Sequence, residues 1–351
     1  MITSCASEAR ILRRPTIADL SRASGCSVAT VDRVLNRRLP VRDDTARRVA
    51  EAAAAIGFHA ASLLKQRAEE APARTFGFVL QKRADAFYQA LAASLAGATR
   101  ASGRIRGKPV SVFVDELVPA SMAQKIRELA RIADALAVVA LDHPYVIEAI
   151  EEVVREGTPV FTLLSDIKAP SRAGYIGLDS RRAGRTAAWA IARMAQPGSE
   201  IGILVGTHRY LGQDLAEAGF RSFFKERAPA FRLLETMVDL EDDRIAYQAT
   251  LDILTRKTDI GGIYLAGGGM KGMIEALREE KAAGRTIVVC NELLPVTRAA
   301  LADGIIDVVL STPLLALAER TIEAMIQSSG GAVRGFENIH LPTEIFISEN
   351  V

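Results

Sequence analysis

The pattern of hydrophobic positions along the chain changes near residue 75. Before that point, residues 16–57 carry short apolar repeats at helical spacing and no run that is typical of a strand. After it, short apolar runs alternate with amphipathic stretches of helical length. The apolar runs are Thr75–Leu80, Val110–Val114, Leu136–Leu141, Pro159–Leu164, Tyr175–Leu178, Ile201–Val205, Ile260–Leu265, Thr286–Cys290 and Asp307–Leu310. We therefore predict an all-α head at residues 16–58 and an α/β body at residues 75–351.

The alternation in the body predicts parallel sheets, because right-handed strand–helix–strand crossovers cover both faces of a sheet with helices. More than 270 residues of this pattern exceed one open sheet of ordinary size, so we expect two doubly wound parallel-sheet lobes. The N-terminal lobe should take in about residues 75–178 plus 311–336. The C-terminal lobe should take in about residues 179–310 plus 337–351.

The first residues and the segment between head and body have a different character. Residues 1–15 contain three arginines but no apolar signal core, and we expect a flexible N-terminal arm there. Residues 66–74 are polar and include Pro72, which is typical of a linker. We therefore assign residues 59–74 to a hinge and linker.

The segment Thr16–Asn36 has the features of two helices joined by a tight turn. Thr16 is placed to cap the first helix, and Asp19 adds an acid in its first turn. Gly25 suits the turn because glycine tolerates a left-handed backbone. Ser27 is placed to cap the second helix.

The second helix of this segment pairs an apolar face with a face of short polar residues. Its apolar face is predicted to hold Val28, Val31, Val34 and Leu35. A third helix is expected over Asp43–Ile56, ended by Gly57. This is the helix-turn-helix pattern, in which the second helix enters the major groove of DNA. The alternative is a plain three-helix bundle without a ligand.

Charge separates these two interpretations. The whole chain has a formal net charge of +2, but residues 1–68 hold twelve Lys/Arg and six Asp/Glu. A basic head on a mildly acidic body indicates a polyanionic partner for the head alone. DNA binding is therefore favoured. The candidate DNA-binding residues are Thr16, Ser27, Val28, Ala29, Thr30, Asp32, Arg33, Asn36, Arg37 and Arg67.

The head resembles that of the LacI/GalR family of bacterial transcriptional regulators, with the motif T-x-x-D-[LV]-A-x-x-A-G-V-S-x-x-T-V-S-R-V-L-N. The residues shared with the family are Asp19, Ala23, Gly25, Ser27, Thr30, Val31, Arg33, Val34, Leu35, Asn36, Thr45, Arg47, Val49, Ala52, Gly57 and the aromatic Phe58. Cys26 stands where valine is usual, and Asp32 where serine is usual. The resemblance covers nearly the whole chain. It implies a body of the type I periplasmic-binding-protein fold, a ligand between the lobes and a homodimer on palindromic operator DNA.

Two features of the head depart from the family and leave alternatives open. Asp32 could accept from a cytosine in the major groove, or pair locally with Arg33 or Asn36 and hold their rotamers. The family's Pro-Asn pair before the hinge helix is missing here. The position of the family's minor-groove leucine holds Arg67, although Leu64 lies one turn away. Either a leucine wedge or an arginine in a narrowed groove would serve as the hinge contact.

The body should bind its ligand at the carboxyl ends of the strands. The candidate effector-binding residues, which follow the predicted strands, are Phe87, Tyr88, Asp142, His143, Ser165, Asp166, Asp179, His208, Arg209, Tyr210, Gly267, Asn291 and Glu292. Aromatic faces, carboxylates, amides and arginine together suit a polyhydroxyl ligand. We therefore expect a small carbohydrate-type effector, meaning a sugar, a polyol or a sugar derivative.

The resemblance adds that Phe87, Asp142, Asp166 and Glu292 lie where ribose-type members of the superfamily place ligand contacts. Two departures matter. The family commonly has a sugar-gripping arginine three residues before a Gly-aromatic pair, where this chain has Ala216. An asparagine is common where Gly267 stands. The nearby His208 and Arg209 could substitute for these groups.

Several candidate residues also have a purely structural interpretation. His143, next to Pro144, could cap a helix. Asp179 could form ion pairs with the nearby arginines Arg181, Arg182 and Arg185. The triple glycine 267–269 lacks the pattern of a phosphate-binding loop. Trp189, the single tryptophan, is expected in the core.

Other function classes are disfavoured. The cysteines at positions 5, 26 and 290 show neither metal-ligand spacing nor a disulfide framework, and no run of 18 apolar residues exists. There is no nucleophile elbow and no metal-ligand cluster, so we expect no enzyme, no metal and no cofactor.

We predict a cytoplasmic, sequence-specific DNA-binding regulator, a repressor, with no membrane contact. The alternative is an exported solute-binding protein for a sugar or polyol. Whether the effector releases or strengthens DNA binding stays open.

Overall fold

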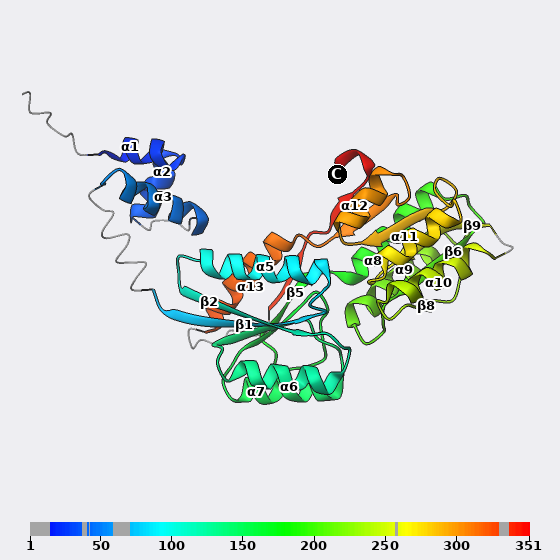
Figure 1. The fold of residues 1–351 in the computed structure, drawn as a ribbon, viewed down its shortest axis with the longest axis horizontal. Coiled ribbons are helices and arrows are strands. Elements are labelled where there is room, and N and C mark those ends of the chain that lie inside the picture. The colour runs from blue at the N-terminus through cyan, green and yellow to red at the C-terminus, as the bar shows by residue number, and fades with distance from the viewer. Residues whose placement is uncertain (1–14, 37–40, 42, 59–70, 257–258, 330–336) are drawn as a thin grey trace, which may run out of the picture. The chain divides into compact units, whose positions relative to one another are not determined.

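The computed structural model describes residues 15–36, 41, 43–58, 71–256, 259–329 and 337–351. It divides into two compact units, one of residues 1–74 with 99–108 and one of residues 75–98 with 109–351. The helical head belongs to the first unit, and the α/β body lies mainly in the second (Figure 1). The predicted fold class, a helix-turn-helix head with a two-lobed α/β body of parallel sheets, is confirmed.

The head begins with a capped helix and a glycine turn, as its sequence predicts. Helix α1 (Ile17–Ser24) starts at Thr16, whose hydroxyl accepts from the backbone N–H of Asp19 at 3.3 Å. The Asp19 carboxylate in turn accepts from the backbone N–H of Thr16 at 2.8 Å, which completes a capping box. Gly25 ends the helix with φ of 64°.

Helix α2 (Val28–Asn36) and helix α3 (Asp43–Ala55) complete the head. The Ser27 hydroxyl caps α2 by accepting from the backbone N–H of Thr30 at 3.2 Å. The three helices enclose a small apolar core of Leu20, Cys26, Val31, Val49, Ala52, Ala53 and Phe58. Val31 is buried as expected, but Val28 is 53% exposed. The prediction that Val28 packs on the inner face is therefore wrong, because α1 and α3 cover only the side of α2 that carries Val31.

The N-terminal lobe is built on a six-stranded sheet in the order β12-β5-β4-β3-β1-β2. The strands are β1 (Ala73–Gln81), β2 (Arg106–Val114), β3 (Ala135–Val138), β4 (Val160–Leu163), β5 (Gly174–Leu178) and β12 (Glu337–Leu341). One face of the sheet carries α5 (Ala86–Ala101) and α13 (Leu314–Ser328), and the other carries α6 (Pro119–Ala130) and α7 (Pro144–Arg155) (Figure 1).

The C-terminal lobe is built on a seven-stranded sheet in the order β13-β11-β10-β9-β6-β7, with β8 paired to β6. Its strands are β6 (Glu200–Val205), β7 (Arg232–Leu233), β8 (Met237–Val238), β9 (Ile260–Leu265), β10 (Ile287–Asn291), β11 (Val308–Ser311) and β13 (Glu344–Phe346). Its helices are α8 (Ser180–Met194), α9 (Leu211–Arg227), α10 (Asp243–Leu254), α11 (Met270–Glu279) and α12 (Pro295–Ala302), followed by a final 3₁₀ turn, Ser348–Asn350.

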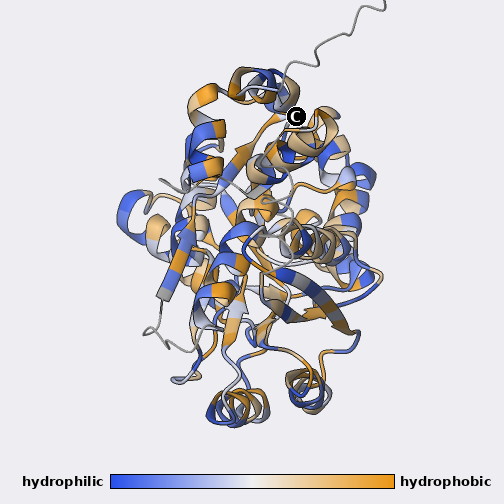
Figure 2. Ribbon diagram, turned by 90° about the vertical axis from the view of Figure 1, so that its left-hand side faces the viewer, coloured by the Kyte–Doolittle hydropathy of each residue, from blue (hydrophilic) through white to orange (hydrophobic). Residues whose placement is uncertain are grey.

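Apolar residues fill both faces of this second sheet. On the face covered by α8 and α9, the rings of Phe220 and Tyr264 stack with centroids 5.0 Å apart. On the other face, Met273, Ile274 and Leu277 of α11 pack against the strands. Helices of the body carry hydrophilic and hydrophobic residues on opposite sides (Figure 2), which is the amphipathic pattern expected of sheet-covering helices.

The structure departs from the sequence-based boundaries at the carboxyl terminus. Strand β12 pairs in parallel with β5, so residues 337–341 belong to the N-terminal lobe and not to the C-terminal lobe as expected. Only the following strand, β13, returns to the second sheet, where it pairs antiparallel with β11. Trp189 is 50% exposed on α8, so its assignment to the core is also wrong. The neighbouring Ala187, Ala188 and Ile191 form the buried face of that helix instead.

Candidate functional site

A cavity of about 390 Å³ lies between the two lobes of the body. Several segments of its wall follow a strand: residues 82–88 follow β1, residues 164–165 follow β4, and residues 291–296 continue from β10. This is the arrangement expected of an open parallel sheet, whose carboxyl ends share one edge. The cavity volume suits a small-molecule ligand.

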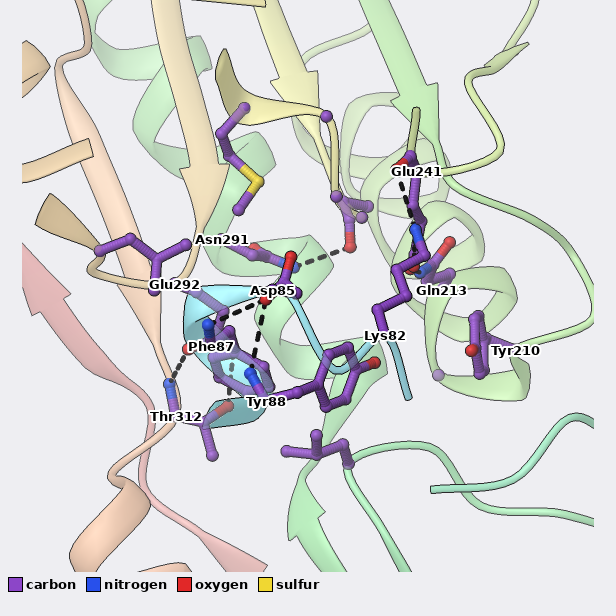
Figure 3. Close-up of a pocket in the computed structure, with 18 of the residues that line it drawn as sticks. Lys82, Asp85, Phe87, Tyr88, Tyr210, Gln213, Glu241, Asn291, Glu292 and Thr312 are labelled. Atoms are coloured by element: carbon purple, nitrogen blue, oxygen red, sulfur yellow. Dashed lines mark hydrogen bonds and ion pairs between the residues drawn. The ribbon is translucent and has the colours of Figure 1, made fainter. Parts of the chain in front are cut away.

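Seven of the thirteen candidate effector-binding residues line this cavity. They are Phe87, Tyr88, Ser165, Tyr210, Gly267, Asn291 and Glu292. Figure 3 shows Phe87 and Tyr88 side by side at the start of α5. Their rings meet edge to face with centroids 5.4 Å apart. They present aromatic surface of the kind that covers the C–H patches of a sugar.

Glu292 is held firmly at the end of β10. One carboxylate oxygen accepts from the Thr312 hydroxyl at 2.7 Å, and the other accepts from the Thr312 backbone N–H at 3.0 Å and the Ser311 hydroxyl at 3.2 Å. Burial raises the pKa of Glu292 to about 7 despite these donors. The adjacent Asn291 donates to the carbonyl of Ala266 at 3.0 Å. The cavity therefore offers a carboxyl group whose charge depends on pH near neutrality.

Six candidate residues lie outside the cavity lining and have partners of their own. Asp166 forms a two-pronged ion pair with Arg172, at 2.7 Å and 2.5 Å. Asp142 accepts from the backbone N–H of Lys168 at 3.1 Å. His208 contacts the Glu217 carboxylate at 2.9 Å. The first two contacts lie within the N-terminal lobe, and the third lies within the C-terminal lobe, between the loop before α9 and α9 itself.

Two of these six residues cap helices, as their structural interpretation proposed. His143 precedes α7, and its ring Nδ1 accepts from the backbone N–H of Tyr145 at 3.2 Å. Asp179 precedes α8 and accepts from the backbone N–H of Arg182 at 3.0 Å. The sixth, Arg209, lies at the lobe boundary, where its carbonyl accepts from the backbone N–H of Asp142 at 2.8 Å.

The cavity also contains polar residues that the sequence analysis missed. The principal ones are Lys82, Asp85, Gln213, Glu241 and Thr312. Lys82 and Asp85 follow β1 directly, so the rule of polar residues after strands could have found them. Glu241 follows β8, a strand of two residues, and Gln213 lies inside α9. Neither of these positions has a signal in the linear pattern.

Unusual backbone geometry concentrates at the cavity. Among described non-glycine residues, six have positive φ, and four of those line the cavity: Lys82 (37°), Leu164 (63°), Glu241 (55°) and Glu292 (67°). Such a conformation costs about 1–3 kcal/mol at each residue and tends to persist at ligand-binding sites. This clustering favours the cavity as the candidate functional site, independently of any resemblance.

Three polar contacts connect the lobes beside the cavity. The Lys82 ammonium group lies 2.9 Å from the carbonyl oxygen of Glu241 and 3.2 Å from its carboxylate. The Gly212 backbone N–H donates to the Ser165 hydroxyl at 3.0 Å. The third is the contact between Asp142 and Arg209 described above. The two lobes therefore contact each other directly beside the cavity.

In the head, the polar face of α2 is open to solvent. Arg33 and Asn36 are exposed, as are Ser27, Val28 and Ala29. The Asn36 side chain donates to the Asp32 carboxylate at 2.6 Å, which is the local pairing considered for Asp32. Two further candidate DNA contacts, Arg37 and Arg67, lie outside the described residues, as does the hinge segment.

Two classes of site are not found within the described ranges. No group of three or more His, Cys, Asp or Glu side chains there could hold a metal ion. No helix in the same residues is long and apolar enough to cross a membrane.

Comparison with known proteins supports both parts of the chain. The family described as "Periplasmic binding protein domain" matches residues 76–332, and the family described as "Bacterial regulatory proteins, lacI family" matches residues 16–60. No curated protein sequence is significantly similar to the chain.

Solved structures share the fold of the body at low sequence identity. GanP, a glucose-galactose binding protein from Geobacillus stearothermophilus, is 17% identical with a TM-score of 0.71, over 80% of this chain and 99% of that one. A solute-binding protein from Agrobacterium vitis, bound with α-D-tagatopyranose, is 17% identical with a TM-score of 0.72, over 79% and 95%. A periplasmic ribose transporter protein from Conexibacter woesei is 21% identical with a TM-score of 0.69, over 80% and 93%. With a lacI-type head in front of a periplasmic-binding-protein body, the chain belongs to the LacI/GalR family of bacterial regulatory proteins.

Proposed function

We propose that the protein is a sequence-specific DNA-binding transcriptional repressor, controlled by a small carbohydrate-type effector that binds between the lobes. It acts as a homodimer on a palindromic operator. The observation that carries this proposal is the presence, in one chain, of a capped helix with an open polar face and a cavity between the lobes at the strand ends. The helix is suited to binding DNA, and the cavity is suited to binding a small molecule.

The head supports the DNA-binding part. Helix α2 exposes Arg33 and Asn36, whose side chains pair with guanine and adenine respectively in the major groove. The buried core of the head holds this helix rigidly against α1 and α3. The excess of basic residues before residue 69 supplies attraction to phosphates that does not depend on the base sequence.

The cavity supports a carbohydrate-type effector. It combines the aromatic rings of Phe87, Tyr88 and Tyr210 with the oxygen and nitrogen atoms of Asn291 and Glu292. Rings cover C–H faces, while carboxylates and amides pair with hydroxyls. The structural neighbours described above include proteins named for glucose and galactose, for tagatose and for ribose. This agrees with the chemistry of the lining.

The test uses the full-length protein. Selection from random double-stranded DNA should enrich one motif, and the sugars that change binding to this motif should also raise the melting temperature by mass action. Arg33→Ala should relax the selected motif at one base pair without changing the sugar response. If selection yields no motif, the DNA-reading part of the proposal is wrong.

A second candidate function is solute binding without any DNA role, because the structural neighbours named above are sugar-binding proteins. Under this alternative, the protein would bind a sugar tightly, and DNA binding would be weak and independent of sequence. A sugar-responsive, enriched DNA motif would exclude it.

A further inference from the structure

The charges that line the cavity do not balance. The Lys82 ammonium group forms an ion pair with the Glu241 carboxylate. That carboxylate also accepts a hydrogen bond from the Gln213 side chain at 2.8 Å. That leaves two inner carboxyl groups, those of Asp85 and Glu292, for which the described residues provide no basic partner. The inner wall is therefore acidic.

The outer charges do not correct this imbalance. Asp243 and Lys271 also line the cavity, but both are exposed and of opposite sign. Among the residues that the structure describes, no arginine belongs to the lining, and Ala216 occupies the place in α9 where a longer cationic side chain would reach inward. The imbalance at Asp85 and Glu292 is therefore left for a ligand to neutralise.

Asp85 is well placed for this role. One of its oxygens accepts from the backbone N–H groups of Phe87 and Tyr88, at 2.8 Å and 3.4 Å, and so begins helix α5. The second oxygen accepts from none of the described side chains or backbone groups. In Figure 3 the carboxylate lies among the drawn lining residues, with dashed lines to the backbone of Phe87 and Tyr88.

We propose, building on the proposed function, that the effector is a polyhydroxylated molecule with a protonated amine, such as an amino sugar or an amino polyol. Its ammonium group binds the free oxygen of Asp85, with Glu292 as the second anionic group of the wall. The rings of Phe87 and Tyr88 cover the carbon skeleton.

Physical chemistry favours a cation over a neutral or an anionic ligand. A ligand seated against the half-buried Asp85 carboxylate takes it out of water, which is costly unless an opposite charge accompanies it. A neutral sugar would donate hydroxyls but leave that charge unbalanced, and a sugar acid would add a like charge. An ammonium group supplies charge and donors together, and it is attracted to aromatic faces within about 6 Å.

The raised pKa values of the cavity tyrosines are consistent with a negative electrostatic potential in the cavity. Burial raises the pKa of the Tyr88 hydroxyl well above its usual value, and Tyr210 and the charges of Glu241, Asp85 and Glu292 raise it further. The pKa of Tyr210 is raised by burial and by Glu241. A cation entering this space is stabilised by the same field that disfavours the tyrosinate anions.

The experiment is calorimetric titration of the full-length protein with matched triplets of ligands. Each triplet holds a hexose, its 2-amino-2-deoxy form and its uronate, in the glucose, galactose and mannose series. The amine of at least one series should bind about tenfold more tightly than the matched neutral sugar. The uronate should bind more weakly than both.

A charge-neutral variant with a matched control links the preference to Asp85. Asp85→Asn keeps the helix cap, because asparagine caps helices as well as aspartate does. It should remove the preference for the amine and leave the affinity for the neutral sugar within about twofold. Asp242→Asn is the control: Asp242 caps α10 with the same pair of backbone contacts, at 2.9 Å and 3.3 Å, but does not line the cavity.

The outcomes separate this inference from the proposed function. Equal or tighter binding of the neutral sugars overturns the inference and leaves a carbohydrate sensor in place. If no member of any triplet binds, both the amine and the carbohydrate effector are rejected. A loss of amine preference in Asp242→Asn equal to that in Asp85→Asn would show a general charge effect and would also overturn the assignment to Asp85.

Discussion

At the scale of single residues, the C-terminal lobe holds a buried carboxyl group behind the cavity wall. Asp239 is fully buried; one of its oxygens accepts from the backbone N–H of Glu241 at 2.7 Å, and the other lacks a hydrogen-bond partner in the described structure. Burial raises the pKa of Asp239 to about 7, the charge of Glu241 raises it and that of Lys82 lowers it. This group therefore changes its protonation in the physiological pH range.

Asp239 should make the protein less stable as pH rises. Because the folded protein binds this proton more tightly than the unfolded chain, the contribution is favourable below about pH 4 and is lost as pH approaches 7. At most about 4 kcal/mol is involved, from the difference between the ordinary pKa and the raised one. We expect the melting temperature of Asp239→Asn to fall less between about pH 5 and pH 8 than that of the wild type. Parallel pH curves for the two proteins would show that Asp239 does not titrate in this range.

Arg33 should determine one base pair of the operator. Its side chain is exposed on α2, and arginine commonly pairs with guanine through two hydrogen bonds. Arg33→Ala should cost about 1–3 kcal/mol on the operator and relax the preference at that position. Fluorescence anisotropy with operator and scrambled DNA measures both effects. An equal loss on the two DNAs would mean that Arg33 contacts phosphate only.

At the scale of elements, α8 and α9 pack with their backbones close together. A methyl group at Gly184 of α8 would lie 1.9 Å from the Ala216 carbonyl oxygen, and one at Gly219 of α9 would lie 2.1 Å from the Arg181 carbonyl oxygen. Because the obstacles are backbone atoms, the helices would have to move apart. Ala216 also lines the cavity, so the spacing of this helix pair sets the position of one wall.

Gly184→Ala should therefore lower both stability and effector affinity. Overpacking of this kind typically costs about 1–3 kcal/mol. The matched control is Gly97→Ala in α5, where a methyl group would meet nothing within 4 Å. That change should stabilise the protein by about 0.5–1 kcal/mol, because alanine favours a helix over glycine. Urea unfolding of the two variants tests the pair, and an unchanged midpoint for Gly184→Ala would contradict the close packing.

At the scale of the whole molecule, the arrangement of the two lobes must be coupled to DNA binding by the head if the effector controls DNA binding. The ion pair between Lys82 and Glu241 joins the lobes beside the cavity, so a ligand that favours one lobe arrangement can shift the population. A ligand with equal affinity for both arrangements would shift nothing.

The proposed homodimer makes a further prediction about the operator. Two heads related by a two-fold axis should protect two inverted half-sites, and the spacing of those half-sites reflects the symmetry of the dimer. Footprinting at saturating protein should show both half-sites, and sedimentation should show a dimer on the DNA. Protection of one unpaired half-site at saturation would contradict a dimeric regulator.

The sequence by itself determined the features that depend on neighbouring residues. The cap at Thr16, the turn at Gly25 and the cap at Ser27 follow from side chains that reach backbone groups within a few residues, and the structure confirms all three. Apolar runs that alternate with helical stretches likewise predicted where most of the strands lie along the chain. The rule of polar residues after strands placed Phe87, Tyr88, Asn291 and Glu292 in positions that line one cavity.

Only the tertiary structure decided which residues share a wall and which side chains are already engaged. Asp166 follows a strand as Glu292 does, but Arg172, six residues away, binds it, and it does not line the cavity. Glu241 and Gln213 entered the cavity from a two-residue strand and a helix, which periodicity does not detect. Strand β12 belongs to the first lobe because it pairs with β5. The two strands are more than 150 residues apart in the chain, so the local sequence pattern does not reveal the pairing. Local hydrogen bonds are encoded within a few residues, whereas burial, charge pairing and sheet order depend on segments that meet only when the chain folds.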